Sequence, residues 1–328
     1  MNKDPTQPNF STLYDQVSAS SPWIDPWFPA NKSSMVWPDV GEQWKTSDGQ
    51  WDFEWFRIKD KYDSDKYSLF GSNGVSPADI FQGYVGNCWF MSTLSAIAEK
   101  PKRVEKMFLN PSNKIEDKGV YAVSMYALGV PHTVIVDDYL PMLKRGNGTY
   151  YNLFARAEGD KSVWASIIEK AFAKFNGNYM HLEDGWSIKA TNSLQGGPWE
   201  EYRHFCEFTG TPITTVDELW SLLKTHDLNA EIIQTNTGNN GGHHMYTKAR
   251  NGLVPHHAYT TLGVTEAVPG VKLVKVRNPW GFEGYSGPWC DKCDEWKGVP
   301  QEIKDKLSFT ESLDGVFYMT VEDYHGAF

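Results

Sequence analysis

The sequence predicts an α+β fold made of two domains, a helical first part and a β-rich second part. Apolar residues recur at helical spacing in 88–98 and again in 163–175. After the Gly-Gly-Pro segment 196–198, the pattern changes to alternating β-branched segments. We therefore place the domain boundary there, with the N-terminal leader and first domain in residues 1–198 and the second domain in residues 199–328.

The other elements follow from the same two periodicities. Residues 1–50 are rich in proline, serine and tryptophan, which predicts a mostly irregular leader lying over the first domain. Alternating β-branched residues predict strands in both domains, and acidic residues open one further helix. The predicted strands are 120–130, 132–136, 231–236, 257–264, 271–277 and 315–321, and the further helix is 216–225.

Composition argues against several classes of protein. The 328 residues carry a formal net charge of −10, which disfavours nucleic acid as the main partner. The chain has no apolar run of about 18 residues, so the sequence predicts no transmembrane segment, and its N-terminus lacks the apolar core of a signal peptide. The four cysteines are too few and too scattered for a disulfide framework, so we expect a cytoplasmic protein.

One cysteine stands where a glycine-bearing loop meets a helix. Cys88 follows Gly83 and Gly86, and Asn87 before it is a favourable N-cap residue. The N–H groups and dipole of a helix start favour a thiolate. Gln82, six positions earlier, offers an amide donor, so the stretch holds a nucleophile and an oxyanion donor for acyl transfer. Taken alone, such a cysteine is more often structural, so the assignment depends on a base elsewhere.

The second domain supplies a candidate base and a partner for it. Suppose that the strands flanking the turn 265–270 form a hairpin in which Val264 pairs with Val271. His257 then lies opposite Asn278, with the two side chains on one face of the sheet. The asparagine oxygen would fix one imidazole nitrogen and leave the other for a thiol, as in the Cys-His-Asn triad of papain-like proteases.

Trp280 lies just beyond this pair and would cover it and exclude water. The simpler alternatives are that His257 is an ordinary strand-end histidine and that Asn278 is a turn residue before Pro279.

Several motifs in a fixed order resemble the calpain family of cysteine proteases. QGYVGNCWF, GLVPHHAYTTLGV and VRNPWG are similar to the family patterns Q-G-x-x-G-D-C-W, G-H-A-Y and R-N-P-W-G. The likeness extends from about residue 79 to the C-terminus, with further matches at 136–138, 169–174 and 314–319. It implies a papain-like calpain protease core, in which a helical cysteine domain and an antiparallel β-rich His/Asn domain flank a cleft for extended protein substrates.

The resemblance also implies a role for each candidate residue. Cys88 would be the nucleophile, His257 the base, and Asn278 the residue that orients it. Gln82 would line the oxyanion hole, and Trp280 would be a movable wedge between the domains. The chemistry needs no cofactor.

Calcium is a possible conformational activator, because the family core binds two calcium ions that bring its domains together. Ser162 stands where the first site has a glutamate, although Asp160 lies nearby. Gly284 and Val316 replace glutamates of the second site, although Glu283 is adjacent to the first of them. We therefore expect calcium to matter less here than in typical calpains. The matching residues are Asp79, Gly74 and Ser72 in the first site and Asp291 and Asp314 in the second.

Other features carry less weight. Asn87 and His256 replace the Asp and Gly of the family motifs, and neither change removes a catalytic group. A structural zinc needs four ligands, and the pair Cys290 and Cys293 has no second pair to complete such a site. His243 and His244 are expected to be exposed loop residues, and Asp137 and Asp138 a solvated or capping pair at a strand end.

We therefore expect an intracellular cysteine endopeptidase that makes limited cuts in proteins by acyl-thioester chemistry. One alternative is a catalytically silent protease-fold module that binds protein partners or calcium, and another is an acyltransferase on the same triad. The presence of Cys88, His257 and Asn278 together favours the endopeptidase. The sequence does not predict the oligomeric state or the natural substrates.

Overall fold

The structure is a computed structural model that describes residues 8–35, 53–144, 146–156, 160–205, 211–238, 250–282 and 284–328. The chain divides into two compact units, residues 1–199 and residues 200–328, and each is described by itself. Helices and antiparallel sheets occur in both units, which confirms the α+β prediction. Within the described ranges, no helix combines the length and apolarity that a membrane crossing requires.

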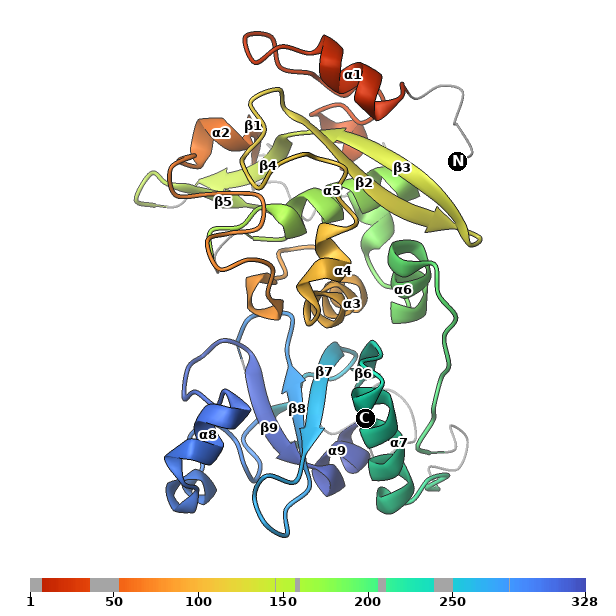
Figure 1. Ribbon diagram of the computed structural model, residues 1–328, viewed down its shortest axis with the longest axis vertical. Coiled ribbons are helices and arrows are strands. Elements are labelled where there is room, and N and C mark those ends of the chain that lie inside the picture. Colours follow the sequence, from red (N-terminus) through yellow and green to blue (C-terminus); the bar gives the residue numbers. More distant parts are fainter. Residues whose placement is uncertain are drawn as a thin grey trace, which may run out of the picture. The chain divides into compact units, whose positions relative to one another are not determined.

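The first unit combines helices with two antiparallel sheets (Figure 1). One sheet has the strand order β1-β4-β5, and β2 and β3 form a separate hairpin. The strands are β1 (Glu54–Arg57), β2 (Val120–Ala127), β3 (Val130–Asp137), β4 (Tyr139–Lys144) and β5 (Tyr150–Asn152). The α-helices are α1 (Phe10–Gln16), α2 (Ile58–Lys61), α3 (Cys88–Ala98), α4 (Pro101–Glu105), α5 (Trp164–Asn176) and α6 (Ser187–Gln195), and the 3-10 helices are η1 (Lys32–Ser34), η3 (Pro77–Asp79) and η4 (Tyr179–Leu182).

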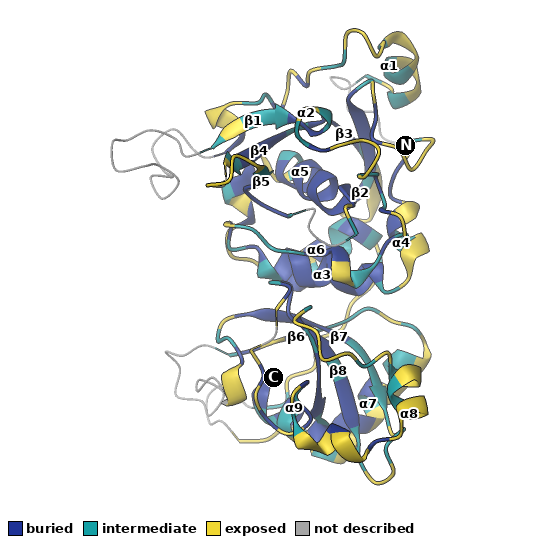
Figure 2. Ribbon diagram, turned by 90° about the vertical axis from the view of Figure 1, so that its left-hand side faces the viewer, coloured by how far each residue is buried: buried dark blue, intermediate teal, exposed yellow. Residues whose placement is uncertain are grey.

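Two buried helices form the centre of this unit. Helix α3 is buried from Trp89 to Ala98 and packs against α4 and α6, and α5 is buried from Trp164 to Ala173 and packs against the β2–β3 hairpin (Figure 2). The leader adds a layer outside the hairpin, where apolar residues of 10–23 pack on Val120, Ala122 and Ile135. Cys88 is therefore the first residue of a helix that is packed in the core along its length.

Asp137 and Asp138 are not the solvated pair that the sequence suggested. Both are fully buried, Asp137 in an ion pair with Lys170 and Asp138 in an ion pair with Arg57. Each cation comes from a different element, α5 or β1. A charge in the core needs such a partner, because an unpaired one would lose its hydration without compensation.

The second unit is an antiparallel sheet of order β6-β7-β8-β9 with helices on both faces. Along β9, Phe317 and Met319 belong to a core with α7 and α9, whereas Tyr318 between them belongs to a second core with η7 and α8. The strands are β6 (Ile233–Asn236), β7 (Ala258–Thr265), β8 (Leu273–Arg277) and β9 (Val316–Thr320). The helices are α7 (Val216–Leu228), α8 (Gln301–Leu307), α9 (Val321–Ala327), η6 (Arg250–Gly252) and η7 (Asp294–Gly298).

The register predicted for the β7–β8 hairpin is wrong. Val264 pairs with Val274 instead of Val271, and the register shifts between Thr261 and Gly263. The connecting turn is longer than predicted, because the last pair before it is Thr265 with Leu273. The irregularity at Gly263 then shifts the register of the pairs that lie farther from the turn. His257 and Asn278 are therefore not a cross-strand pair, because each lies one residue beyond the end of its strand.

Cys290 and Cys293 form a disulfide. This one pair, three positions apart in the sequence, is not a disulfide framework of the kind that stabilises small secreted domains. Cys206, His243, His244 and Glu283 lie outside the described residues.

Candidate active site

Cys88 is the first residue of α3, as predicted, and it is partly exposed. Asn87 holds the N-cap position, but its side chain makes no capping hydrogen bond. Its Nδ2 donates instead to Oε1 of Glu169 at 2.7 Å. The prediction that Asn87 caps the helix is thus wrong for its side chain, because the bond to the buried Glu169 carboxyl fixes the amide in an orientation in which Oδ1 accepts no N–H of the described residues.

Glu169 is a residue that sequence reasoning missed. Its carboxyl is 1% exposed and also accepts the backbone N–H of Ala155 at 2.8 Å. Burial raises the pKa of this carboxyl to about 7, and the hydrogen bonds from Ala155 and Asn87 act in the opposite direction. Glu169 thus ties α5 to the residue just before Cys88. An acidic residue in a helix segment that is otherwise mostly apolar was the available signal.

Gln82 lies on a loop that is held against the backbone of residues 153–156. Tyr84 N–H donates to Leu153 O at 3.0 Å, and a Cβ on Gly83 would overlap the carbonyl oxygen of Phe154, so glycine permits the close approach. The Gln82 Nε2 group donates to Val85 O at 3.0 Å. This bond orients the amide and uses one of its two hydrogens.

In the second unit, His257 and Asn278 are in direct contact. His257 Nε2 lies 2.8 Å from Asn278 Oδ1, and both residues are buried. The same oxygen accepts the backbone N–H of Trp280 at 3.0 Å, which identifies it as the acceptor. Nε2 must therefore carry the imidazole proton, so in the neutral ring Nδ1 carries the lone pair.

The surroundings hold the His257–Asn278 pair in place. Thr237 accepts the His257 N–H on its hydroxyl at 3.0 Å and donates its own N–H to the His257 carbonyl at 3.0 Å. The Trp280 ring lies 4.5 Å from the imidazole between centroids, and Tyr259 meets it edge-on at 4.9 Å. Sequence reasoning placed Trp280 over the pair but missed Thr237, which is an ordinary strand-end residue in the sequence.

Burial lowers the pKa of His257 to about 4, and the hydrogen bond to Asn278 acts in the opposite direction. The unfolded chain, with an ordinary histidine pKa near 6.5, therefore binds a proton more readily than the folded one. The contribution of His257 to stability is present above pH 6.5 and is lost as the pH falls toward 4.

Acid is therefore expected to destabilise the protein through this histidine. Between pH 7 and pH 5 the free energy of unfolding should fall by about 2 kcal/mol on account of His257. Urea denaturation of the wild type and of a His257→Gln variant at both pH values measures the difference. His204, whose pKa burial also lowers to about 4, has the same sign of effect, so His204→Gln is the matched comparison. Equal pH dependence in the wild type and in His257→Gln would contradict the assignment.

The residues of the first predicted calcium site come together, but hydrogen-bond donors occupy their oxygens. Asp79 Oδ2 accepts Ser76 N–H and Trp164 Nε1–H, each at 2.9 Å. The Asp160 carboxylate accepts Ser72 Oγ–H at 2.8 Å and both the backbone and side-chain N–H of Asn73, at 2.5 and 3.0 Å. A calcium ligand would have to give up these bonds, so the site does not fit the ion.

At the second predicted calcium site, hydrogen-bond donors occupy the oxygens of one of the two carboxylates. Asp314 accepts Val316 N–H on one oxygen and Ser312 Oγ–H on the other, both at 2.8 Å. Asp291 is buried at 4% exposure. In the part of the chain that the structure describes, no group of three or more His, Cys, Asp or Glu side chains is placed to hold a metal ion.

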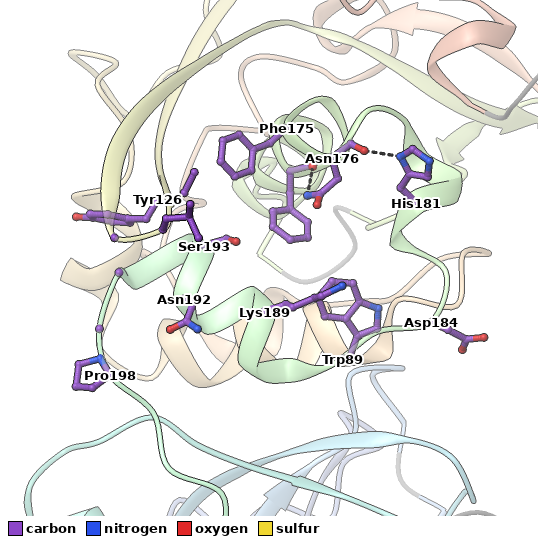
Figure 3. A pocket seen from close by; sticks show the side chains of 16 residues that line it. Trp89, Tyr126, Phe175, Asn176, His181, Asp184, Lys189, Asn192, Ser193 and Pro198 are labelled. Atoms are coloured by element: carbon purple, nitrogen blue, oxygen red, sulfur yellow. Dashed lines mark hydrogen bonds between the residues drawn. The ribbon is translucent and has the colours of Figure 1, made fainter. Parts of the chain in front are cut away.

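The first unit also contains a cavity of about 640 Å³ (Figure 3). Figure 3 shows Trp89 and Lys189 on one side of it and Phe175 and Asn176 on the other. None of the predicted catalytic residues lines it. The cavity adjoins the candidate site through Trp89, the residue after Cys88, and through Asp184, whose N–H donates to Gly86 O at 3.0 Å. Because no predicted catalytic residue lines it, this cavity is not the place of the chemistry that the sequence predicts.

Comparison with known proteins agrees with the motifs. A sequence model of the calpain family of cysteine proteases matches residues 23–328. The calpain-type cysteine protease DEK1 of Zea mays is 33% identical over 281 residues, which are 83% of this chain and 12% of that protein. Calpain-5 of Mus musculus is 28% identical over 325 residues, 91% of this chain and 47% of that protein. Calpain-12 of Homo sapiens is 27% identical over 305 residues, which are 92% of this chain and 39% of that protein.

The chain therefore spans about an eighth of the plant relative and less than half of the two animal relatives.

Proposed function

The chain belongs to the calpain family of cysteine proteases, and on that premise we propose that it is an intracellular, cytoplasmic endopeptidase that makes limited cuts in proteins. The observation that carries the proposal is the buried His257–Asn278 contact at 2.8 Å, which leaves the Nδ1 lone pair to accept a thiol proton. Cys88, at the start of α3, is the nucleophile that this base serves. Cys88 and His257 lie on different units, so the proposal requires them to meet in the active protein.

The reaction has two halves. His257 Nδ1 takes the Cys88 thiol proton, and the sulfur attacks the carbonyl carbon of the scissile peptide bond. Gln82 Nε2 and the Cys88 N–H donate to the oxyanion. The tetrahedral intermediate then collapses to a thioester, and His257 returns the proton to the leaving amine. Water, deprotonated by His257, hydrolyses the thioester and restores the thiol.

Asn278 and Trp280 support this sequence of steps. Asn278 holds the Nε2–H tautomer and stabilises the imidazolium that forms during each half-reaction. Trp280 lies over the ring and limits the access of water to the His257–Asn278 bond. Incubation of the full chain with casein, followed by mass analysis of the products, tests the proposal. Hydrolysed fragments support an endopeptidase, acyl transfer to an added amine without hydrolysis supports an acyltransferase, and intact casein supports a silent binding module.

Calcium is expected to change the activity little, because hydrogen-bond donors already occupy carboxylate oxygens of Asp79 and Asp160 at the first predicted site and of Asp314 at the second. A ligand shifts a conformational equilibrium only by its difference in affinity for the two states, and poor sites give a small difference. Peptidase activity in a chelator should therefore stay within about threefold of the activity in millimolar calcium. Calorimetry of the wild type, with Asp79→Asn as the matched variant, measures the binding. Two tight sites, with activity absent until both are filled, would contradict the prediction and leave the protease assignment intact.

A further inference from the structure

An arginine lies beside the loop that carries Gln82 and leads to Cys88. The Arg156 guanidinium carbon lies 5.7 Å from the centroid of the Tyr84 ring and 5.3 Å from that of Tyr151. The two tyrosine hydroxyls are 3.4 Å apart. A backbone hydrogen bond also joins Arg156 to this loop, since Arg156 N–H donates to Phe81 O, next to Gln82, at 2.9 Å. The cation is thus fixed next to the loop by both side-chain and backbone contacts.

This cation lacks an anionic partner among the described residues. No carboxylate of the described ranges forms an ion pair with Arg156, and its buried Nε finds no hydrogen-bond acceptor there. In a chain with a net charge of −10, other buried or half-buried cations such as Arg57, Lys170 and Lys174 do have such partners. Tyr84 is 56% exposed, so the Arg156 group is open to a molecule from outside.

The distance along the chain limits where such a molecule would lie. Tyr84 precedes Cys88 by four residues, and four extended residues span at most about 14 Å. An extended peptide substrate advances about 3.3 Å per residue. The backbone of a substrate residue opposite Tyr84 therefore lies within about four positions of the bond that is cut, and the substrate side chain supplies the reach from there to Arg156.

We propose that Arg156, held by Tyr84 and Tyr151, forms a specificity subsite for an anionic side chain of the protein substrate. The ligand is a carboxylate of Asp or Glu or the phosphate of a phosphorylated residue, since a guanidinium binds the paired oxygens of both. The proposal rests on the proposed peptidase function and names the class of sequence that the enzyme selects.

The test uses the full chain and a set of cleavable peptides. In each peptide one position is varied, among the four positions before and the four after the bond that is cut. The varied position carries glutamate, phosphoserine, glutamine or lysine. At one position, kcat/KM should be about tenfold higher with an anionic residue than with glutamine. Arg156→Gln should cut the anionic and glutamine peptides at similar rates, and Arg156→Glu should prefer lysine. Lys102→Gln, which removes an exposed cation on α4, is the control and should keep the preference.

The relative rates of the glutamate and phosphoserine peptides decide between the two anionic ligands. An unchanged anionic preference in Arg156→Gln, or no anionic preference at any position, would overturn the proposal.

A binding measurement separates this proposal from the peptidase proposal. Calorimetry with the Cys88→Ser variant and the best anionic peptide should show binding that weakens about tenfold when Arg156→Gln is added. If the wild type cuts no peptide but this binding and its loss are observed, the peptidase proposal fails and the anionic site stands. If peptides are cut and Arg156→Gln binds the anionic peptide as before, the site fails and the peptidase stands.

Discussion

Replacement of Cys88 by serine is expected to reduce peptidase activity on the order of 10⁴- to 10⁶-fold, which is the size of loss that removal of a nucleophile causes in triad enzymes. Cys88 opens α3, and its N-cap neighbour Asn87 turns its amide to Glu169 and not to the helix. A serine hydroxyl at this place is a far weaker nucleophile at neutral pH than a thiolate, although it differs little in size. The melting temperature should therefore stay close to that of the wild type while the rate of casein hydrolysis falls to background.

Alkylation gives an independent measurement of the same assignment. Iodoacetamide should modify Cys88 first and inactivate the enzyme in step with the labelling. Cys290 and Cys293 are joined in a disulfide and do not compete until they are reduced. Cys206→Ser is the matched control and should retain both labelling and activity. Full peptidase activity in Cys88→Ser would refute the nucleophile assignment.

The parts of the site that the sequence predicted are those governed by local pattern. Cys88 opens a helix because a glycine-bearing loop precedes a run of helical apolar period, and both signals lie within about fifteen residues. His257 and Asn278 meet because they lie at the open end of one hairpin, where several strand registers would bring them close together. The predicted register was wrong, yet the contact was right, because side chains just beyond the strand ends have more freedom to reach each other than a ladder pair.

What the sequence did not predict depends on partners distant in the chain. Glu169 takes the amide of Asn87 across 82 residues, and Asp137 and Asp138 are neutralised by Lys170 and Arg57 on other elements. The strands β4 and β5 were missed because 139–152 alternates weakly and contains proline and glycine. A local pattern identifies a helix start or a strand, but it does not state which buried charge meets which donor.

Gln82→Ala is expected to lower kcat about 100- to 1,000-fold, the usual loss when one oxyanion donor is removed. We expect the variant to fold normally, because the Gln82 side chain contributes little to stability. The only hydrogen bond that the Gln82 side chain donates within the described residues goes to Val85 O, and its loss should lower the free energy of unfolding by about 1 kcal/mol. The backbone contacts from Tyr84 and Gly83 to residues 153–154 hold the loop without it.

The second amide hydrogen of Gln82 remains available to donate to the oxyanion of the tetrahedral intermediate. Gln82→Glu is the matched control, because it keeps the size of the side chain but offers no N–H. It should lose at least as much turnover as alanine, since its carboxylate would repel the oxyanion. Turnover and melting temperature of both variants are measured side by side. A variant that melts much lower while turnover of the folded fraction is unchanged would show that Gln82 supports the loop and takes no part in the chemistry.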